Sequence, residues 1–421
     1  MAEANSPREN VRALQRALYV AAKRNGRRKF PVLYDRIARP DVLQRAFEQV
    51  RRNRGAAGID GETLKAIEAQ GVELDRMLGL PQNDPVTLDL DSTTEVYGGQ
   101  KEDATYNYEG KRSLGSLFCT WAERRRVVAA QLRSGSASDK PISPAVVQRA
   151  LRTLPQGHGE VRLRADSGFY SVPFLKWCRR HRLGFCVVVP PYQTMWEARR
   201  HISPMSWRPA QEMAERPVVP TGWEGEPLRL LVRRVRVEAE EISQSSRSRR
   251  RRTIPKQQLR LALKGVVGHT YSYFFIVTDL SGDAVELEHW QRRRAHIEER
   301  IKDLKLGCGL LHLPLRRRRA NYAWQTAVVI ASNRTAMLSA VNVARERQEA
   351  QAAAGGTLSA EELDAVGQPH NTAMLRRWPL TVPARLVCNA RQLRLRLAQG
   401  MFHKQEFWAL QRHILSLAPA G

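Results

Sequence analysis

Cysteine is scarce in this chain of 421 residues, which contains five cysteines and no Cys-x-x-Cys pair. An odd number of scattered cysteines argues against a disulfide framework and against a zinc site built from thiolates. No run approaches 18 consecutive apolar residues, and the first ten residues, MAEANSPREN, lack the apolar centre of a secretion signal. We therefore expect a cytoplasmic protein with no membrane partner.

Acidic residues are also few, because 42 Asp and Glu stand against 69 Lys and Arg, for a net charge of +27. The excess is spread along the chain and is not confined to a tail. A generally basic soluble protein is the plain interpretation. A polyanionic partner, nucleic acid above all, fits so large an excess better, because binding of phosphates releases counterions. The length predicts two to four domains.

The N-terminal part has helical periodicity over residues 10–51, followed by the glycine-rich stretch RRNRGAAGIDGETLKAIE. Residues 10–75, and KFPVLYDRIARPDVLQRAFEQVRRNRGAAGIDGETLKAIEAQGVE in particular, resemble the N-terminal region of group II intron reverse transcriptase/maturases. The chain has no Tyr-x-Asp-Asp signature, so we infer no polymerase activity. Residues 1–76 are predicted to be a basic helical fragment, either an RNA-binding remnant or the result of a gene fusion.

From Pro85 onward the pattern changes to strands that are later joined by helices. Alternation of apolar and polar residues predicts strands at PVTLDLDST, SLFCTWAE, VVAAQLR, VRLRAD and GFCVVVP. Helices are expected at SPAVVQRALRTL, with Ser143 as its N-cap, and near 172–182. This succession predicts a mixed α/β sheet flanked by helices.

The second half of the chain is predicted to contain a β-rich insertion and several basic helices. The run SRSRRRRT in the insertion is expected to be a solvated loop, and RERQEAQAAAGGTLSAEELD a mobile connection. Helices are expected at 287–306 and 320–348. The predicted divisions are 1–76, 85–190 (first part of the α/β domain), 191–285 (insertion), 286–348 (helices that complete the α/β domain) and 349–421 (linker and C-terminal helical part).

Three carboxylates suggest a metal site. Asp91 and Asp166 each end a predicted strand, and Glu298 lies in the helical stretch HWQRRRAHIEERIKDLK. Carboxylates at the rim of a sheet, together with one from a neighbouring helix, supply the oxygen ligands that hard divalent cations take. Taken singly, each has a simpler interpretation, because an Asp after a strand is often a turn residue and Glu298 is placed to pair with Lys302. Asp89 shares a strand face with Asp91 and could equally be the ligand.

Two cations stand on the same predicted helix as Glu298. Arg294 lies four residues before it and Lys305 seven after it, so the three side chains project from nearly one face. A metal-binding carboxylate between two residues that grip DNA phosphates would make a coherent site. The simpler alternative is a set of ion pairs on a basic amphipathic helix.

Residues 85–421 resemble DDE transposases of insertion-sequence type, closest to the insertion sequence thirteen-eighty family. The matching stretches are LDLDSTTEVYG, YNYEGKRS, LRADSGFYS, YFFIVTDL, RRRAHIEERIKDLKLGCGLLHLP and RRWPLTVPARLV. The resemblance implies an RNase H-like fold with Asp91, Asp166 and Glu298 as the metal-binding triad. The group's Tyr–Arg–Glu–Lys signature places its Arg at Arg294 and its Lys at Lys305, but Gln291 stands where the signature has Tyr.

The resemblance further implies cleavage and transfer of DNA strands with two Mg²⁺ ions, for which Mn²⁺ may substitute. The partners would be the terminal inverted repeats of an element and its target DNA, bound by a homodimer in the cytoplasm at the nucleoid. Loss of the family's N-terminal DNA-recognition helices, whose place the maturase-like piece takes, would leave such an enzyme defective. The alternatives are a catalytically inactive nucleic-acid-binding remnant and an RNA-binding protein like the maturases. Arg316, Arg317, Arg318 and Arg319 are predicted to bind the DNA backbone, and a solvated basic face is the plain alternative. Trp207 and Trp223 are predicted to stack on bases, and packing in the core is the simpler interpretation for a tryptophan.

Overall fold

The structure is a computed structural model, and it describes residues 84–97, 100–107, 109–155, 157–208, 212–244, 249–367, 369–376, 384–389, 392–397 and 404–417, with Arg16. The predicted helical segment 1–76 therefore lies outside the described residues, Arg16 apart. The chain separates into two compact units. We call Asn83–Glu95 with Tyr106–Asp303 the sheet unit, and the one that contains Val96–Thr105 and Leu304–Gly421 the helical unit.

The sheet unit is built on a mixed sheet whose first part runs in the order β4-β3-β1-β5-β6. Strand β4 is antiparallel to β3, whereas β5 runs parallel to β1 and β6 parallel to β5. An antiparallel hairpin followed by two parallel crossover strands is the strand arrangement of an RNase H-like fold, which confirms the predicted fold class. The strands of this part are β1 (Val86–Val96), β3 (Arg112–Trp121), β4 (Arg126–Ser134), β5 (Val161–Ala165) and β6 (Gly184–Val189). The short strand β2 (Thr105–Tyr106) also pairs with β3.

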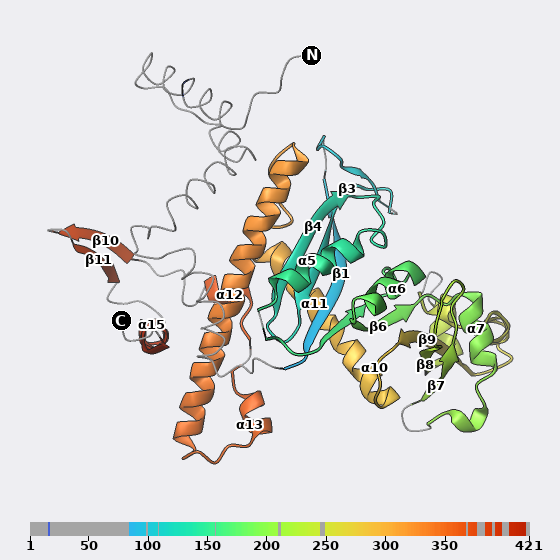
Figure 1. The fold of residues 1–421 in the computed structure, drawn as a ribbon. Coiled ribbons are helices and arrows are strands. Elements are labelled where there is room, and N and C mark those ends of the chain that lie inside the picture. The colour runs from blue at the N-terminus through green and yellow to red at the C-terminus, as the bar shows by residue number, and fades with distance from the viewer. Residues whose placement is uncertain are drawn as a thin grey trace. The chain divides into compact units, whose positions relative to one another are not determined.

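The β-rich insertion extends this sheet. Strand β9 (His269–Thr278) is antiparallel to β6, and β8 (Leu228–Glu238) and β7 (Met213–Val218) follow it outward. The sheet thus has nine described strands, and Figure 1 shows β7, β8 and β9 grouped beyond β6. The shorter elements of this region are α7 (Gln193–Arg200), η1 (Pro204–Ser206), α8 (Ala239–Gln244), η2 (Arg249–Thr253) and α9 (Lys256–Leu263).

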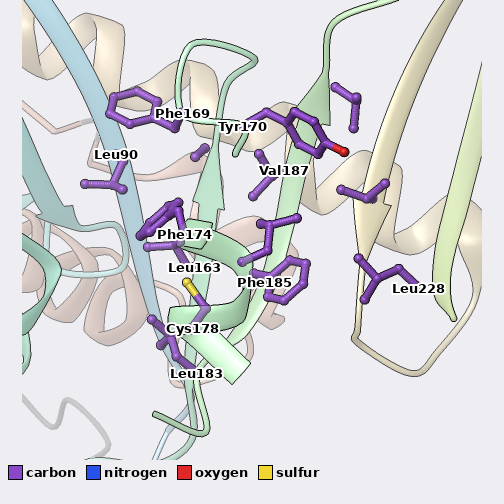
Figure 2. Close-up of a cluster of buried hydrophobic side chains, with 14 of the residues drawn as sticks. Leu90, Leu163, Phe169, Tyr170, Phe174, Cys178, Leu183, Phe185, Val187 and Leu228 are labelled. Atoms are coloured by element: carbon purple, nitrogen blue, oxygen red, sulfur yellow. The ribbon is translucent and has the colours of Figure 1, made fainter. Parts of the chain in front are cut away.

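Both faces of the sheet are covered, because alternate residues of its strands enter two different clusters. Phe185 and Val187 belong to the larger cluster, to which helix α6 (Val172–Arg180) contributes Phe174 and Cys178, as Figure 2 shows. Cys186, between them in β6, belongs to a second cluster with residues of α10 (Ala284–Arg292). The two-residue period of a strand thus separates α6 from α10 across the sheet.

Two helices of the sheet unit depart from the sequence prediction. Helix α5 (Ser143–Thr153) has Ile142 at its N-cap position, and Ser143 is its first residue and not its cap. The helix expected at 287–306 is two helices, α10 and α11 (His296–Leu306), joined by the 3₁₀ turn η3 (Arg293–Ala295). Three consecutive arginines give no sequence signal of a break, since Arg is a good helix former.

The helical unit holds the long helix α12 (Arg318–Ala353), followed by α13 (Ala360–Ala365), α14 (Thr372–Leu375) and α15 (Lys404–Leu417). The predicted mobile connection is wrong, because α12 continues to Ala353 and α13 begins with a capping box at Ser359 and Glu362. The prediction gave too much weight to Gly355 and Gly356 and too little to the helix-forming Glu, Gln, Arg and Ala before them.

The predicted all-helical C-terminal part is also wrong, because it contains an antiparallel hairpin of β10 (Ala384–Asn389) and β11 (Gln392–Leu397). The sequence QLRLRL alternates with a period of two, a strand signal that we missed.

Among the described helices, α12 is long and apolar enough to cross a membrane by length and composition. The core helix of a soluble protein meets the same criterion. The buried polar residues Asn321, Gln325 and Asn342 on α12 suit packing within a protein.

Candidate active site

The two predicted strand carboxylates lie at the same edge of the sheet. The parallel pairing of β1 with β5 ends at Leu90 opposite Ala165, and Asp91 and Asp166 are the next residues of the two strands. Neighbouring strands are about 4.8 Å apart, so equivalent positions on parallel strands are close. Strand β1 itself continues to Val96, so Asp91 lies where the pairing with β5 ends and not at the end of the strand.

Asp166 is held by the turn that follows it. Its Oδ1 accepts a hydrogen bond from the backbone N–H of Gly168 at 2.9 Å, and its backbone oxygen accepts one from Phe169. A Cβ added at Gly168 would come within 3.1 Å of that Oδ1. A side chain at position 168 would push the Asp166 carboxylate aside by a few tenths of an ångström, so glycine is favoured in this turn.

Glu298 is brought toward this edge by Arg294. One nitrogen of the Arg294 guanidinium lies 3.5 Å from Asp91 Oδ2, and the other lies 3.6 Å from Glu298 Oε1. Arg294 and Asp91 are mostly buried, with side chains 14% and 15% exposed, whereas the Glu298 side chain is 66% exposed. Arg294 belongs to η3, so the break between α10 and α11 places its guanidinium between the two carboxylates.

The Asp91 carboxyl is buried and lies near other charged side chains. Burial raises the pKa of its carboxyl to about 6, and the nearby carboxylates of Asp166 and Glu298 also raise it, against the lowering effects of Arg294 and of the Ser92 backbone N–H. The three predicted carboxylates are thus electrostatic neighbours. Among the described residues, however, no group of three His, Cys, Asp or Glu side chains stands close enough together to hold a metal ion as it lies.

Replacing Asp91 by Asn is expected to stabilise the metal-free protein at pH 8. The folded state favours the protonated acid, so ionised Asp91 is destabilising above about pH 6, and this cost disappears below about pH 4. A shift of two pKa units corresponds to about 3 kcal/mol. We expect Asp91→Asn to raise the unfolding free energy by up to that amount at pH 8, measured by denaturant titration in EDTA. An equal or larger gain at pH 4 would contradict this explanation.

Asp89, the alternative ligand, is occupied by a buried ion pair. Arg164 donates to Asp89 Oδ1 at 2.6 Å and to Oδ2 at 2.8 Å, and the two side chains are only 4% and 1% exposed. A third Arg164 nitrogen donates to the Trp290 carbonyl at 2.5 Å. The geometry therefore favours Asp91 as the carboxylate that faces the site and gives Asp89 a structural role.

Gln291, the residue in place of the signature tyrosine, helps to hold α10 against the sheet. It is 3% exposed and donates from Nε2 to the Ala165 carbonyl at 2.9 Å, directly before Asp166. Together with the bond from Arg164 to the Trp290 carbonyl, this contact ties α10 to β5, directly before Asp166. Sequence reasoning missed this role of Gln291, because a buried Gln on a helix has no characteristic pattern.

The other predicted contacts with the DNA backbone belong to the helical unit. Arg316, Arg317, Arg318 and Arg319 are exposed in the helical unit, at the start of α12. Lys101 donates to the carbonyls of Leu313 and Leu315, and Arg318 pairs with Asp103 at 2.8 Å. Lys305 is on α11, seven residues after Glu298.

The two tryptophans proposed to stack on bases are buried. Trp207 is 9% and Trp223 6% exposed, and both belong to the larger core cluster. Arg234 lies over the Trp207 ring, and Trp223 donates from its indole nitrogen to the Glu226 carbonyl. Their positions favour a packing role, the simpler of the two interpretations for a tryptophan.

Comparison with known proteins shows the family of this chain. Residues 42–359 match the family model described as transposase DDE domain group 1. The chain belongs to this DDE transposase family. The match begins inside the segment that resembles maturases, and that resemblance is not confirmed. No match was found among curated proteins.

Solved structures also match the transposase. One is a piggyBac transposase synaptic complex with hairpin DNA, at 10% identity and a TM-score of 0.39. The alignment covers 79% of this chain and 57% of the piggyBac chain.

Proposed function

We propose that this transposase cuts and joins DNA strands with a divalent metal held by Asp91, Asp166 and Glu298. The observation that best supports the proposal is the parallel register of β1 and β5, whose last pair, Leu90 and Ala165, comes directly before Asp91 and Asp166. Glu298 is linked to Asp91 through Arg294. The donor set fits Mg²⁺ in its chemistry, because all three ligands are carboxylates. Burial is the main cause of the raised pKa of Asp91, and a bound cation would stabilise the ionised carboxylate against both that burial and the charges of Asp166 and Glu298.

The metal, when bound, would lower the pKa of an attacking water or 3′-hydroxyl and stabilise the departing 3′-oxygen, with two ions in the full mechanism. The residues of the chain position that chemistry. Asp166 is fixed by the Gly168 turn, and the more exposed Glu298 can move toward an ion. Arg294 offsets part of the negative charge of Asp91 and Glu298 and would be available to a DNA phosphate once a cation takes over that role.

The direct test is cleavage of duplex DNA that carries the inverted repeats of the element. We expect nicking at the repeat ends that requires Mg²⁺ or Mn²⁺ and that EDTA abolishes. We also propose that the protein acts as a dimer that holds two DNA ends and that it belongs to the insertion sequence thirteen-eighty family. Cleavage that continues in EDTA would contradict a metal-dependent mechanism.

DNA binding is proposed to involve the exposed arginines at the start of α12. We expect substitution of Arg316, Arg317 and Arg319 together by Gln to weaken binding of all DNA sequences alike. The slope of log K against log salt should fall by about 1 for each lost phosphate contact. Fluorescence anisotropy over a salt series measures this slope.

The matched control is Arg318→Gln, because Arg318 is already paired with Asp103. It should change the slope by clearly less than one third of the triple effect. Equal slopes for the triple variant and the wild type would exclude this run from the DNA interface.

An inactive nucleic-acid-binding remnant is the second candidate. It is favoured by the finding that the described side chains do not surround a cation as they lie. Such a protein would bind DNA with the same salt dependence and would not cut it. Maturase-like RNA binding depends on residues 10–75, and loss of intron RNA binding on their deletion would support it.

A further inference from the structure

A fourth carboxylate, Asp139, is linked to Asp91 through Ser92. The Ser92 hydroxyl donates to Asp139 Oδ2 at 3.0 Å, and the Ser92 backbone N–H donates to Asp91 Oδ1 at 2.8 Å. One residue thus contacts both carboxylates, with its side chain on one and its backbone on the other. Ser92 is half-buried, and the Asp139 side chain is 19% exposed.

Asp139 is itself anchored from two sides. Arg133 in β4, with a side chain 8% exposed, lies 2.7 Å from Asp139 Oδ1 and donates to the Ala137 carbonyl at 2.9 Å. The Asp139 carbonyl accepts hydrogen bonds from the Ser143 hydroxyl and from the backbone N–H groups of Ile142 and Ser143. The turn before α5 and the hairpin β3–β4 therefore fix the position of the Asp139 carboxylate.

We propose that Asp139 and Ser92 are positioning residues for Asp91. The chain of contacts runs from Arg133 to Asp139, then to the Ser92 hydroxyl, and through the Ser92 backbone to the Asp91 carboxylate. The link lies where β1 loses one of its two neighbours, because the pairing with β5 ends at Leu90, whereas β1 itself continues to Val96 and is also paired with β3. The inference rests on the proposed metal-dependent function and adds residues that act through Asp91.

The test compares Ser92→Ala, which removes the link, with Ser92→Thr, which keeps a hydroxyl at the same place. The readouts are Mn²⁺ affinity by electron paramagnetic resonance and the kcat and KM of DNA cleavage. We expect Ser92→Ala to weaken Mn²⁺ binding and lower kcat by about 10- to 100-fold, as for other residues that orient metal ligands. KM for DNA should stay unchanged, and Ser92→Thr should recover most of both losses.

Asp139→Ala should reproduce the Ser92→Ala effect, and the double variant should lose little more, because both break one chain of contacts. Losses in the double variant equal to the product of the single losses would overturn the linkage. So would wild-type Mn²⁺ affinity in Ser92→Ala. The proposed function would survive either result. If Mn²⁺ binding by the wild-type protein did not depend on Asp91, both the proposed function and this inference would be contradicted.

Discussion

Asp166→Asn is expected to abolish cleavage of terminal-repeat DNA while leaving the binding of that DNA intact. The amide keeps an oxygen for the Gly168 N–H but loses the charge that a divalent cation requires. The rate should fall by at least about 10³-fold, beyond the 10- to 100-fold typical of residues that only support a ligand. Single-turnover cleavage assays in Mg²⁺ and Mn²⁺, with binding measured in parallel, give this result.

The helix carboxylate offers a matched control for the same experiment. Glu298 and Glu299 are adjacent and equally exposed, with side chains 66% and 65% exposed. Glu298 faces Arg294, whereas Glu299 pairs with Arg125 at 3.6 Å. Glu298→Gln should be as inactive as Asp166→Asn, and Glu299→Gln should retain wild-type activity. Normal cleavage by Glu298→Gln would remove the helix from the site.

Breaking the buried pair of Asp89 and Arg164 should give the largest loss of stability. Asp89→Asn leaves the Arg164 guanidinium buried without its counter-charge, which costs about 3–5 kcal/mol in comparable cases. We expect the unfolding transition of the sheet unit, followed by circular dichroism in urea, to shift accordingly. Cleavage activity should fall as well, since Arg164 also holds the Trp290 carbonyl beside the site.

Two further variants separate this effect from a general sensitivity of β5. Arg162 lies on the same strand and pairs with Glu160 near the surface, the two side chains being 39% and 53% exposed. Arg162→Gln should therefore cost less than about 1 kcal/mol. The double variant Asp89→Leu with Arg164→Met should recover much of the loss of the single variant, because paired apolar residues leave no buried charge. A loss of less than 1 kcal/mol for Asp89→Asn would contradict the assigned role.

The strand carboxylates could be predicted from the sequence because their signal is local. Alternation fixes which residues of a strand face the core, and Asp91 and Asp166 interrupt two such strands at corresponding points. Their proximity then follows from a parallel sheet. The choice between Asp89 and Asp91 could not be made from the sequence, since it depends on Arg164 from another strand.

The roles of Gln291 and Asp139 lay beyond sequence reasoning for a different reason. Each depends on hydrogen bonds between residues far apart in the chain, such as Gln291 with Ala165 and Asp139 with Ser92. Local propensity describes none of these contacts. The hairpin β10–β11, in contrast, could have been predicted, because its sequence alternates between apolar and polar residues.

The most direct test of the central claim is anomalous diffraction from crystals of the protein grown with DNA ends and Mn²⁺. The proposed site predicts a peak within about 2.5 Å of carboxylate oxygens from both Asp91 and Asp166, with Glu298 turned toward the same ion or its neighbour. A Mn²⁺ ion bound elsewhere, with Arg294 still lying between Asp91 and Glu298, would contradict it.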